Sequence, residues 1–127
     1  MITNTRRPKF LNLFKIHLPV TGVTSFAHRV SGALLFVSLP FWVYLFSLSL
    51  HNEASFKLAL GYLTSPWTRL VLLILLWSIL HHLFAGIRFL LLDIHLGHSL
   101  KSARRSAWLV NFTGAILFVV LALWWLL

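Results

Sequence analysis

Three long runs of apolar residues, separated by short polar segments, dominate the pattern of this chain. An α-helix of about 20 apolar residues is long enough to cross the ~30 Å hydrocarbon core of a membrane. Each run reaches that length when its polar flanks are included. The pattern therefore predicts an all-α membrane protein in which residues 1–127 form a single domain. Its three transmembrane helices are expected at about residues 23–50, 67–92 and 106–127.

The polar segments predict how these helices are connected. Residues 1–18 mix basic and apolar side chains, which is typical of a short amphipathic arm lying at a membrane surface. Residues 51–66 are expected to form a short polar connection, and residues 93–106 a polar, basic loop. Pro40 lies inside the first predicted helix and is expected to kink it.

Composition excludes a soluble domain and nucleic-acid binding. Of the 127 residues, 59% are hydrophobic, and the mean hydropathy is +0.88. A soluble domain of this size buries too small a fraction of its surface to hide so many apolar residues. The formal charge is +9, from 11 Lys and Arg against two acids. In so apolar a chain these charges are expected at the membrane edges rather than on nucleic acid.

The distribution of basic residues predicts the orientation in the membrane. Residues 1–18 hold four Lys or Arg and residues 93–106 hold three, whereas residues 51–66 hold one. Cytoplasmic segments of membrane proteins are enriched in Lys and Arg. The N-terminus and the second connection are therefore predicted in the cytoplasm. The C-terminus is predicted on the other side, which is the periplasm if this is a bacterial inner-membrane protein.

The chain has no cysteine. This excludes disulfides, cysteine-ligated zinc, iron–sulfur ligation and covalent haem attachment through a C-x-x-C-H motif. The only methionine is the first residue, so histidine is the expected ligand of any redox centre that this chain holds.

Ser25, His28, Arg29 and Gly32 form the first polar cluster within the predicted spans. Residues three or four apart share a helix face, so these four are expected to form a polar stripe followed by a gap in the side-chain surface. Ionisable groups inside a membrane usually face a partner, a cavity or a cofactor. The alternative is that Arg29 extends to the cytoplasmic headgroups.

His81 and His82 form the second cluster. Adjacent helical residues point about 100° apart, so they are not expected to ligate the same metal. Ser78 and Gly86 lie one turn on either side of His82, where small residues would admit a flat porphyrin, whereas Trp77 would obstruct one at His81. We therefore predict His82 as the ligand. His81 is left for packing, a hydrogen bond or a partner chain.

The predicted depth of His82 suits a haem. It lies about ten residues from the cytoplasmic end of its helix, or ~15 Å at the helical rise. Haem propionates at this depth require cationic or hydrogen-bonding partners, and His28 and Arg29 are in position to supply them.

Arg88 and Asp93 close the second span, and their roles are open. Arg88 is expected to pair with Asp93 or with a lipid phosphate, and Asp93 to act as a counter-ion at the helix end. Three positions in the last span are expected only to pack helices: Asn111, Thr113 and Gly114.

Two stretches of the chain resemble the cytochrome b subunits of succinate dehydrogenase, respiratory complex II. Residues 25–32, SFAHRVSG, are similar to the pattern S-x-x-H-R-x-[ST]-G of that family. Residues 82–93, HLFAGIRFLLLD, are similar to its second pattern, H-x-x-x-G-[IL]-R-H-x-x-x-D. Arg7-Pro8 also matches the start of the family. One position departs from it, since Phe89 stands where the second pattern usually has histidine.

The resemblance implies a membrane anchor that binds one haem b and helps to form the ubiquinone site. His82 corresponds to an axial ligand of the haem iron, with the other ligand supplied by a second membrane anchor subunit. Ser25 and Arg29 correspond to residues that line the ubiquinone site, and His28 and Arg29 would also lie near the haem propionates. An iron–sulfur subunit and a flavoprotein subunit would complete the complex, within a heterodimeric helix bundle surrounded by membrane lipids.

The hypothesis from the sequence is a subunit that carries no catalysis alone and helps electrons from succinate reach ubiquinone. Two alternatives remain open: a haem-free membrane anchor, and a small ion-conducting membrane protein with His and Arg as a relay. The second alternative would be expected to have more acids within the membrane than this chain has.

Overall fold

The computed structural model describes residues 17–127, which form four helices and no strand. Three of the helices are long and apolar enough to cross a membrane, which confirms the prediction of an all-α membrane protein. Nearly all of the predicted N-terminal arm lies outside the described residues. The helices are α1 (Val20–Ser49), α2 (Glu53–Thr64), α3 (Pro66–Asp93) and α4 (Leu100–Leu126).

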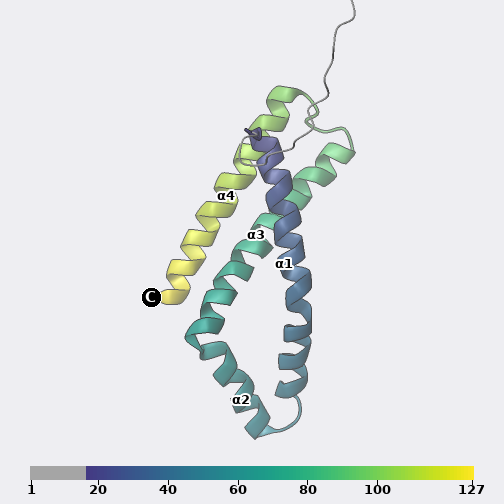
Figure 1. The fold of residues 1–127 in the computed structure, drawn as a ribbon. Coiled ribbons are helices and arrows are strands. Elements are labelled where there is room, and N and C mark those ends of the chain that lie inside the picture. Colours follow the sequence, from purple (N-terminus) through teal and green to yellow (C-terminus); the bar gives the residue numbers. More distant parts are fainter. Residues whose placement is uncertain (1–16) are drawn as a thin grey trace, which may run out of the picture.

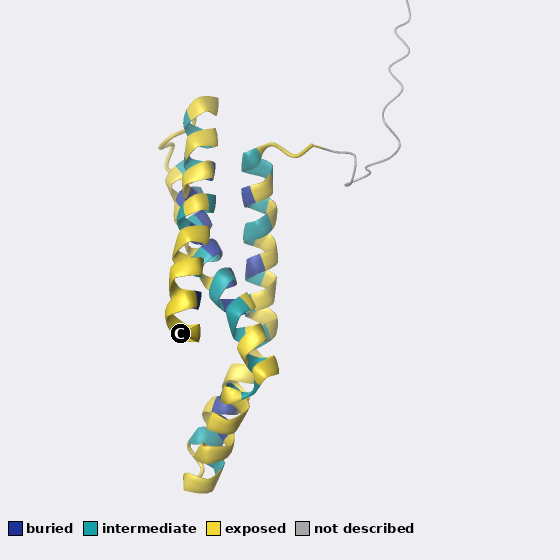
Figure 2. Ribbon diagram, turned by 90° about the vertical axis from the view of Figure 1, so that its left-hand side faces the viewer, coloured by how far each residue is buried: buried dark blue, intermediate teal, exposed yellow. Residues whose placement is uncertain are grey.

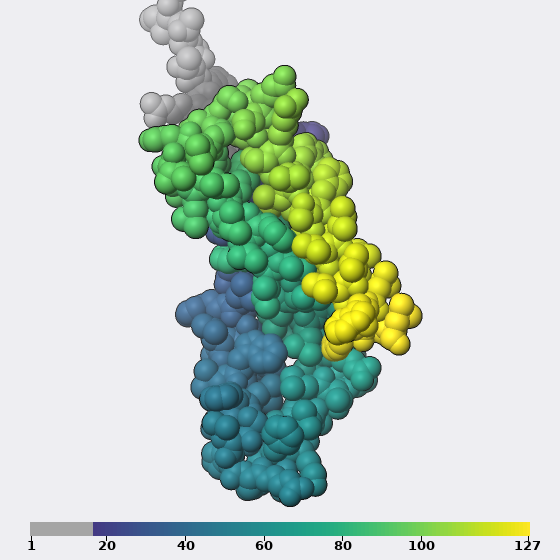
Figure 3. Space-filling model, turned by 180° about the vertical axis from the view of Figure 1, so that it is seen from behind, coloured from purple at the N-terminus to yellow at the C-terminus, as the bar shows by residue number. Residues whose placement is uncertain are grey.

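The start of α1 and the turn between α3 and α4 lie at one end of the molecule, and α2 lies at the other (Figure 1). α3 packs against both α1 and α4. Viewed from behind, α4 lies beside α3, and the end that contains α2 extends beyond the C-terminus of α4 (Figure 3). α3 is therefore the central helix, and its two sides form two different interfaces.

Most of the ribbon is exposed or half-buried, with short buried segments along the helices (Figure 2). Small and polar residues make up much of the buried surface, and most large apolar residues are exposed. Ala85 and Ala107 have no exposed surface, and neither do Thr24, Ser31 and Ser78. In a membrane, small residues at helix interfaces let backbones approach closely, while lipid solvates the apolar exterior. This arrangement is the reverse of a soluble helical bundle.

The segment 51–66, predicted as a polar connection, is instead mostly the helix α2. Asn52 caps it, since its Oδ1 accepts a hydrogen bond of 2.9 Å from the Ser55 backbone N–H. Glu53 and Lys57 form an exposed ion pair one turn apart, at 2.6 Å. The physical reason for the difference is that apolar residues recur every three or four positions over this short segment, which is the spacing of one helix face: Phe56, Ala59, Leu60 and Leu63.

α4 begins six residues before the predicted third span, at Leu100. Ser99 caps it, because its Oγ accepts a hydrogen bond from the Ser102 backbone N–H. The predicted loop is thus reduced to a tight turn, with His95 in the left-handed region at φ 65°. The three basic residues of this segment lie on the first turns of α4, and all three are exposed: Lys101, Arg104 and Arg105.

α1 continues as one helix through Pro40. The missing N–H of a proline breaks one helical hydrogen bond, and transmembrane helices tolerate this more often than soluble ones do. The kink at Pro40 stays a prediction.

Candidate functional site

His82 lies against the backbone of α1. Its Nδ1 is 3.1 Å from the His28 carbonyl oxygen and 3.4 Å from Ser31 Oγ. The Ser31 hydroxyl itself donates to the same carbonyl at 2.8 Å. A carbonyl oxygen only accepts, so the contact at 3.1 Å requires the proton of a neutral His82 to be on Nδ1. Nε2 then keeps its lone pair, which is the form of imidazole that binds a metal.

The rings of His28 and His82 are stacked, with centroids 4.1 Å apart and planes 10° from parallel. Gly32 makes this possible, because a Cβ at that position would lie 2.8 Å from His82 Cε1. A Cβ at Gly86 would lie 3.5 Å from His28 Nε2, an ordinary contact. The glycine of the first sequence pattern therefore leaves room for the histidine of the second.

The small residues on either side of His82 do not both lie open in the structure. Ser78 has no exposed surface, and its hydroxyl donates to the Ile74 carbonyl at 2.9 Å. The expectation that Ser78 offers open surface to a flat cofactor is therefore wrong, because that position lies on the buried side of α3. The small residue that the His82 ring itself requires is Gly32, on the facing helix.

His81 has a different environment from His82. It is 4% exposed, and its ring stacks on Trp77 with centroids 5.4 Å apart. Its Nε2 is 3.5 Å from the Thr24 carbonyl oxygen, at the limit of a hydrogen bond. His81 is thus enclosed by this chain, whereas His82 is half-buried at the edge of the same interface.

Ser25 and Arg29 lie one turn apart on α1, beside His28. Ser25 is half-buried and Arg29 is exposed. Both residues are therefore neighbours of His28 on α1, and Arg29 lies on the outer surface of this chain. There it is accessible to a ligand, a lipid or another subunit.

Arg88 makes its contacts with α4. Its Nε donates to Ser106 Oγ at 3.0 Å, and its Nη2 donates to the Ala103 carbonyl at 3.1 Å. Among the described residues, the ion pair within 4.0 Å is Lys57–Glu53, so the expected pairing of Arg88 with Asp93 is wrong. Asp93 is exposed at the end of α3, while Arg88 turns toward the neighbouring helix.

Two contacts of the site were not predicted from the sequence. Phe89, at the position where the resembled pattern has histidine, lies against the His28 ring with centroids 5.2 Å apart. Ser31 lies beside His82, and the signal for it was present: it occupies the [ST] position of the first pattern, three residues after His28.

The chain has three helices that are able to cross a membrane, and histidines of α1 and α3 stack between two of them. These features define a multi-pass membrane protein with polar side chains between its helices. The family of succinate dehydrogenase/fumarate reductase transmembrane subunits matches residues 3–127. The chain belongs to this family, which confirms the resemblance seen in the sequence.

Two relatives cover nearly the whole chain. A succinate dehydrogenase cytochrome b556 subunit of Coxiella burnetii (strain RSA 493 / Nine Mile phase I) is 36% identical over 122 residues, or 95% of this chain and 98% of the relative. A protein of the same name from Rickettsia bellii (strain RML369-C) is 29% identical over 119 residues, or 94% and 91%.

Proposed function

We propose that this chain is the cytochrome b anchor subunit of a succinate dehydrogenase, that it binds haem b through His82, and that it forms part of the ubiquinone-reduction site. The observation that supports this most strongly is the hydrogen bond from His82 Nδ1 to the His28 carbonyl. It leaves Nε2 available on an imidazole whose orientation is held by α1. Ligating histidines are commonly held in this way by a backbone carbonyl.

The residues present fit a haem iron. His82 offers an imidazole nitrogen and is half-buried at the edge of an apolar bundle. Its ring is held between the His28 ring and the backbone at Gly32. Haem b at this position would supply reversible storage of one electron. The second axial ligand would come from the second anchor subunit, as the resemblance of the chain to its family implies.

Ser25, His28 and Arg29 would serve the remaining polar chemistry. His28, which stacks on His82, and Arg29, the next residue of α1, would bind the haem propionates, since unpaired carboxylates are costly inside a membrane. The Ser25 hydroxyl would donate a hydrogen bond to a quinone carbonyl. The Arg29 guanidinium would stabilise the negative charge that builds up on the quinone oxygens during reduction, as preorganised cations do elsewhere.

The same proposal includes partners and orientation. The iron–sulfur and flavoprotein subunits would dock at the end that carries the start of α1 and the basic start of α4. That end would face the cytoplasm of a bacterium, and the C-terminus would face the periplasm across the inner membrane. Electrons from succinate would then reach ubiquinone at this end of the bundle.

The haem assignment is tested by the reduced-minus-oxidised spectrum of the purified membrane complex. His82→Ala is expected to abolish the b-type α band, while His81→Ala keeps it. The two histidines are neighbours, so the pair separates loss of the ligand from general damage to α3. A wild-type complex without haem would favour a haem-free anchor or an ion-conducting protein.

The quinone assignment is tested with Arg29→Ala. Quinone reductase activity should fall by roughly 10²-fold, while succinate oxidation with an artificial acceptor continues. Arg69→Ala, an exposed arginine at the far end of α3, is the matched control and should leave both activities unchanged. Full quinone reductase activity in an assembled Arg29→Ala complex would contradict the assignment.

A further inference from the structure

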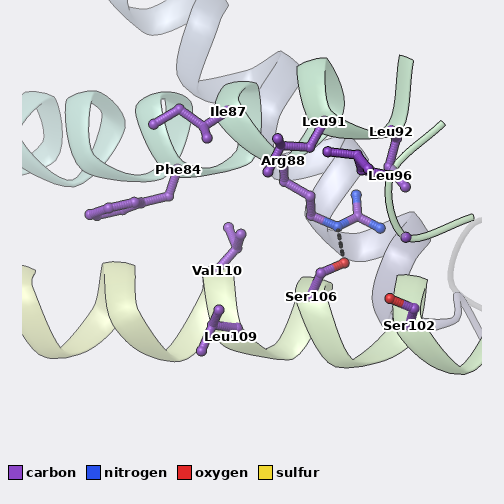
Figure 4. A pocket seen from close by; sticks show the side chains of 11 residues that line it. Phe84, Ile87, Arg88, Leu91, Leu92, Leu96, Ser102, Ser106, Leu109 and Val110 are labelled. Atoms are coloured by element: carbon purple, nitrogen blue, oxygen red, sulfur yellow. Dashed lines mark hydrogen bonds between the residues drawn. The ribbon is translucent and has the colours of Figure 1, made fainter. Parts of the chain in front are cut away.

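A groove of about 360 Å³ runs between α3 and α4 (Figure 4). Its deeper part is apolar, with Phe84, Leu109 and Val110 among the lining residues. Its polar residues gather toward the turn between the two helices, where Ser102 and Ser106 face Arg88. The groove therefore has an apolar section along most of its length, and its polar residues lie at the end near the turn, beside Leu92 and Leu96.

Arg88 is a buried positive charge without a negative partner. It is 5% exposed, and the two atoms to which it donates hydrogen bonds, Ser106 Oγ and the Ala103 carbonyl oxygen, are both neutral. The chain has two acids, and neither lies within 4.0 Å of Arg88. Removing a charge from water without a counter-ion is costly, so the site favours an anion.

The groove lies on the opposite side of α3 from the haem site. His82 contacts α1, whereas Arg88 contacts α4. The charge of Arg88 is therefore not explained by the proposed haem propionates or by the quinone. An anion that satisfies it has to enter between α3 and α4.

One further cation lies near the polar end of the groove. Arg105 is exposed on the first turns of α4. Arg105 follows the lining residue Ser102 by three positions and precedes the lining residue Leu109 by four, so it lies beside the groove. Arg104 lies on the other side of α4. Successive helical residues are rotated by about 100°, and this rotation takes Arg104 further than Arg105 from the residues that line the groove.

We propose that the α3–α4 groove binds an anionic glycerophospholipid. One acyl chain lies along the apolar section, and the phosphate lies among Arg88, Ser102 and Arg105. Basic pockets between transmembrane helices on the cytoplasmic side suit anionic lipid headgroups. A zwitterionic lipid offers the same acyl chain but no net negative charge to offset Arg88.

The test uses the whole complex reconstituted with equal amounts of dioleoyl-phosphatidylglycerol and dioleoyl-phosphatidylcholine. Native mass spectrometry then counts the lipids that stay bound. The wild type is expected to retain phosphatidylglycerol in preference. Arg105→Gln should reduce that preference roughly fivefold, the effect expected of one cation near the headgroups. Arg104→Gln, which moves the same charge on the other side of α4, should leave it unchanged.

Arg88→Gln removes the buried charge and keeps a side-chain donor for Ser106, so the same loss is expected. Leu109→Trp tests the apolar section without changing any charge. It should fill the groove and reduce retention of both lipids, whereas Val119→Trp, further along α4, should not. This pair keeps the proposal testable if the Arg88 variant does not fold.

Equal retention of the two lipids by the wild type would overturn the proposal, and so would equal losses in Arg104→Gln and Arg105→Gln. A photo-reactive benzoylphenylalanine at position 109 distinguishes lipid from protein as the occupant. Crosslinks to lipid support the proposal. Crosslinks to another subunit would show that the groove is a protein interface.

Discussion

The two sides of α3 form interfaces of different kinds, one with α1 and one with α4. On the α1 side, two histidines, a serine and a glycine fit so closely that one ring stacks on another at 4.1 Å. On the α4 side, a single arginine bonds to the neighbouring helix, and a groove of about 360 Å³ remains beside it. The first interface holds its polar side chains in one arrangement, whereas the second leaves space.

The difference shows how a short membrane chain positions polar groups. Where α1 approaches α3 closely, a backbone carbonyl reaches His82 and determines which ring nitrogen carries the proton. On the other side, the long side chain of Arg88 reaches across to Ser106 Oγ and the Ala103 carbonyl of α4, beside the groove. Close approach at Gly32 therefore supplies orientation on the α1 side, whereas the α4 side keeps a groove beside its polar contact.

The largest expected effect comes from adding one methyl group to the close interface. Gly32→Ala places a Cβ 2.8 Å from His82 Cε1, so the ring has to move from its bond with the His28 carbonyl. The b-type α band should then be lost or strongly reduced in the assembled complex. The measurement is haem content per complex, together with the reduced-minus-oxidised spectrum.

The same substitution elsewhere provides a graded control. A Cβ meets nothing within 4 Å at Gly61 or Gly114, so alanine there should leave the spectrum unchanged. Gly86→Ala makes an ordinary contact of 3.5 Å with His28 and should have a small effect. If Gly114→Ala removed haem as completely as Gly32→Ala, close approach at Gly32 would not be the cause.

His81→Ala should lower stability without removing haem. It deletes a buried ring that stacks on Trp77, at a cost of about 2–3 kcal/mol. His81→Phe keeps the aromatic contact and should recover most of the loss. The readout is the thermal midpoint of the complex in detergent, compared with its α band. A lost band in His81→Ala would mean that the roles of the two histidines are reversed.

The number and type of the long helices could be predicted from the sequence, because lipid requires an apolar run of a certain length and a fully bonded backbone. The position of α2 could not, since its short apolar period, Phe56 to Leu63, is interrupted by Lys57 and Gly61. The start of α4 was missed for a related reason. Basic residues at a membrane edge look the same in a loop and on a helix.

The structure brings together several of the residues that were predicted to form the site, but their geometry could not be predicted from the sequence. Spacing identified His82, His28 and Gly32, since intramembrane polar residues are few. Spacing along one helix could not reveal that Gly32 faces the His82 ring, because that contact joins residues 50 positions apart. For the same reason the pairing of Arg88 with Asp93 looked reasonable from sequence, although α4 supplies nearer partners.

A smaller effect is expected on the α4 side of the comparison. Ser106→Ala removes the acceptor of the Arg88 Nε–H, at a cost of about 1–2 kcal/mol, because a buried donor is left without one partner. Ala103 still accepts through its backbone carbonyl, so Arg88 remains partly bonded. Thermal unfolding measures the change. A loss as large as that of His81→Ala would mean that α4 packs as tightly as α1.

The smallest effect concerns the third interface, between α1 and α4, where Thr24 Oγ1 lies 3.1 Å from Asn111 Oδ1. A double-mutant cycle with Thr24→Val and Asn111→Ala isolates this pair. The single O–H of Thr24 can donate instead to the Val20 carbonyl of its own helix, so it keeps a partner when Asn111 is removed. The coupling energy should therefore be about 0.6 kcal/mol, the average for such pairs in membrane proteins. A value near 2 kcal/mol would place a third specific contact beside the histidines and make α4 as important as α1 for the geometry of the site.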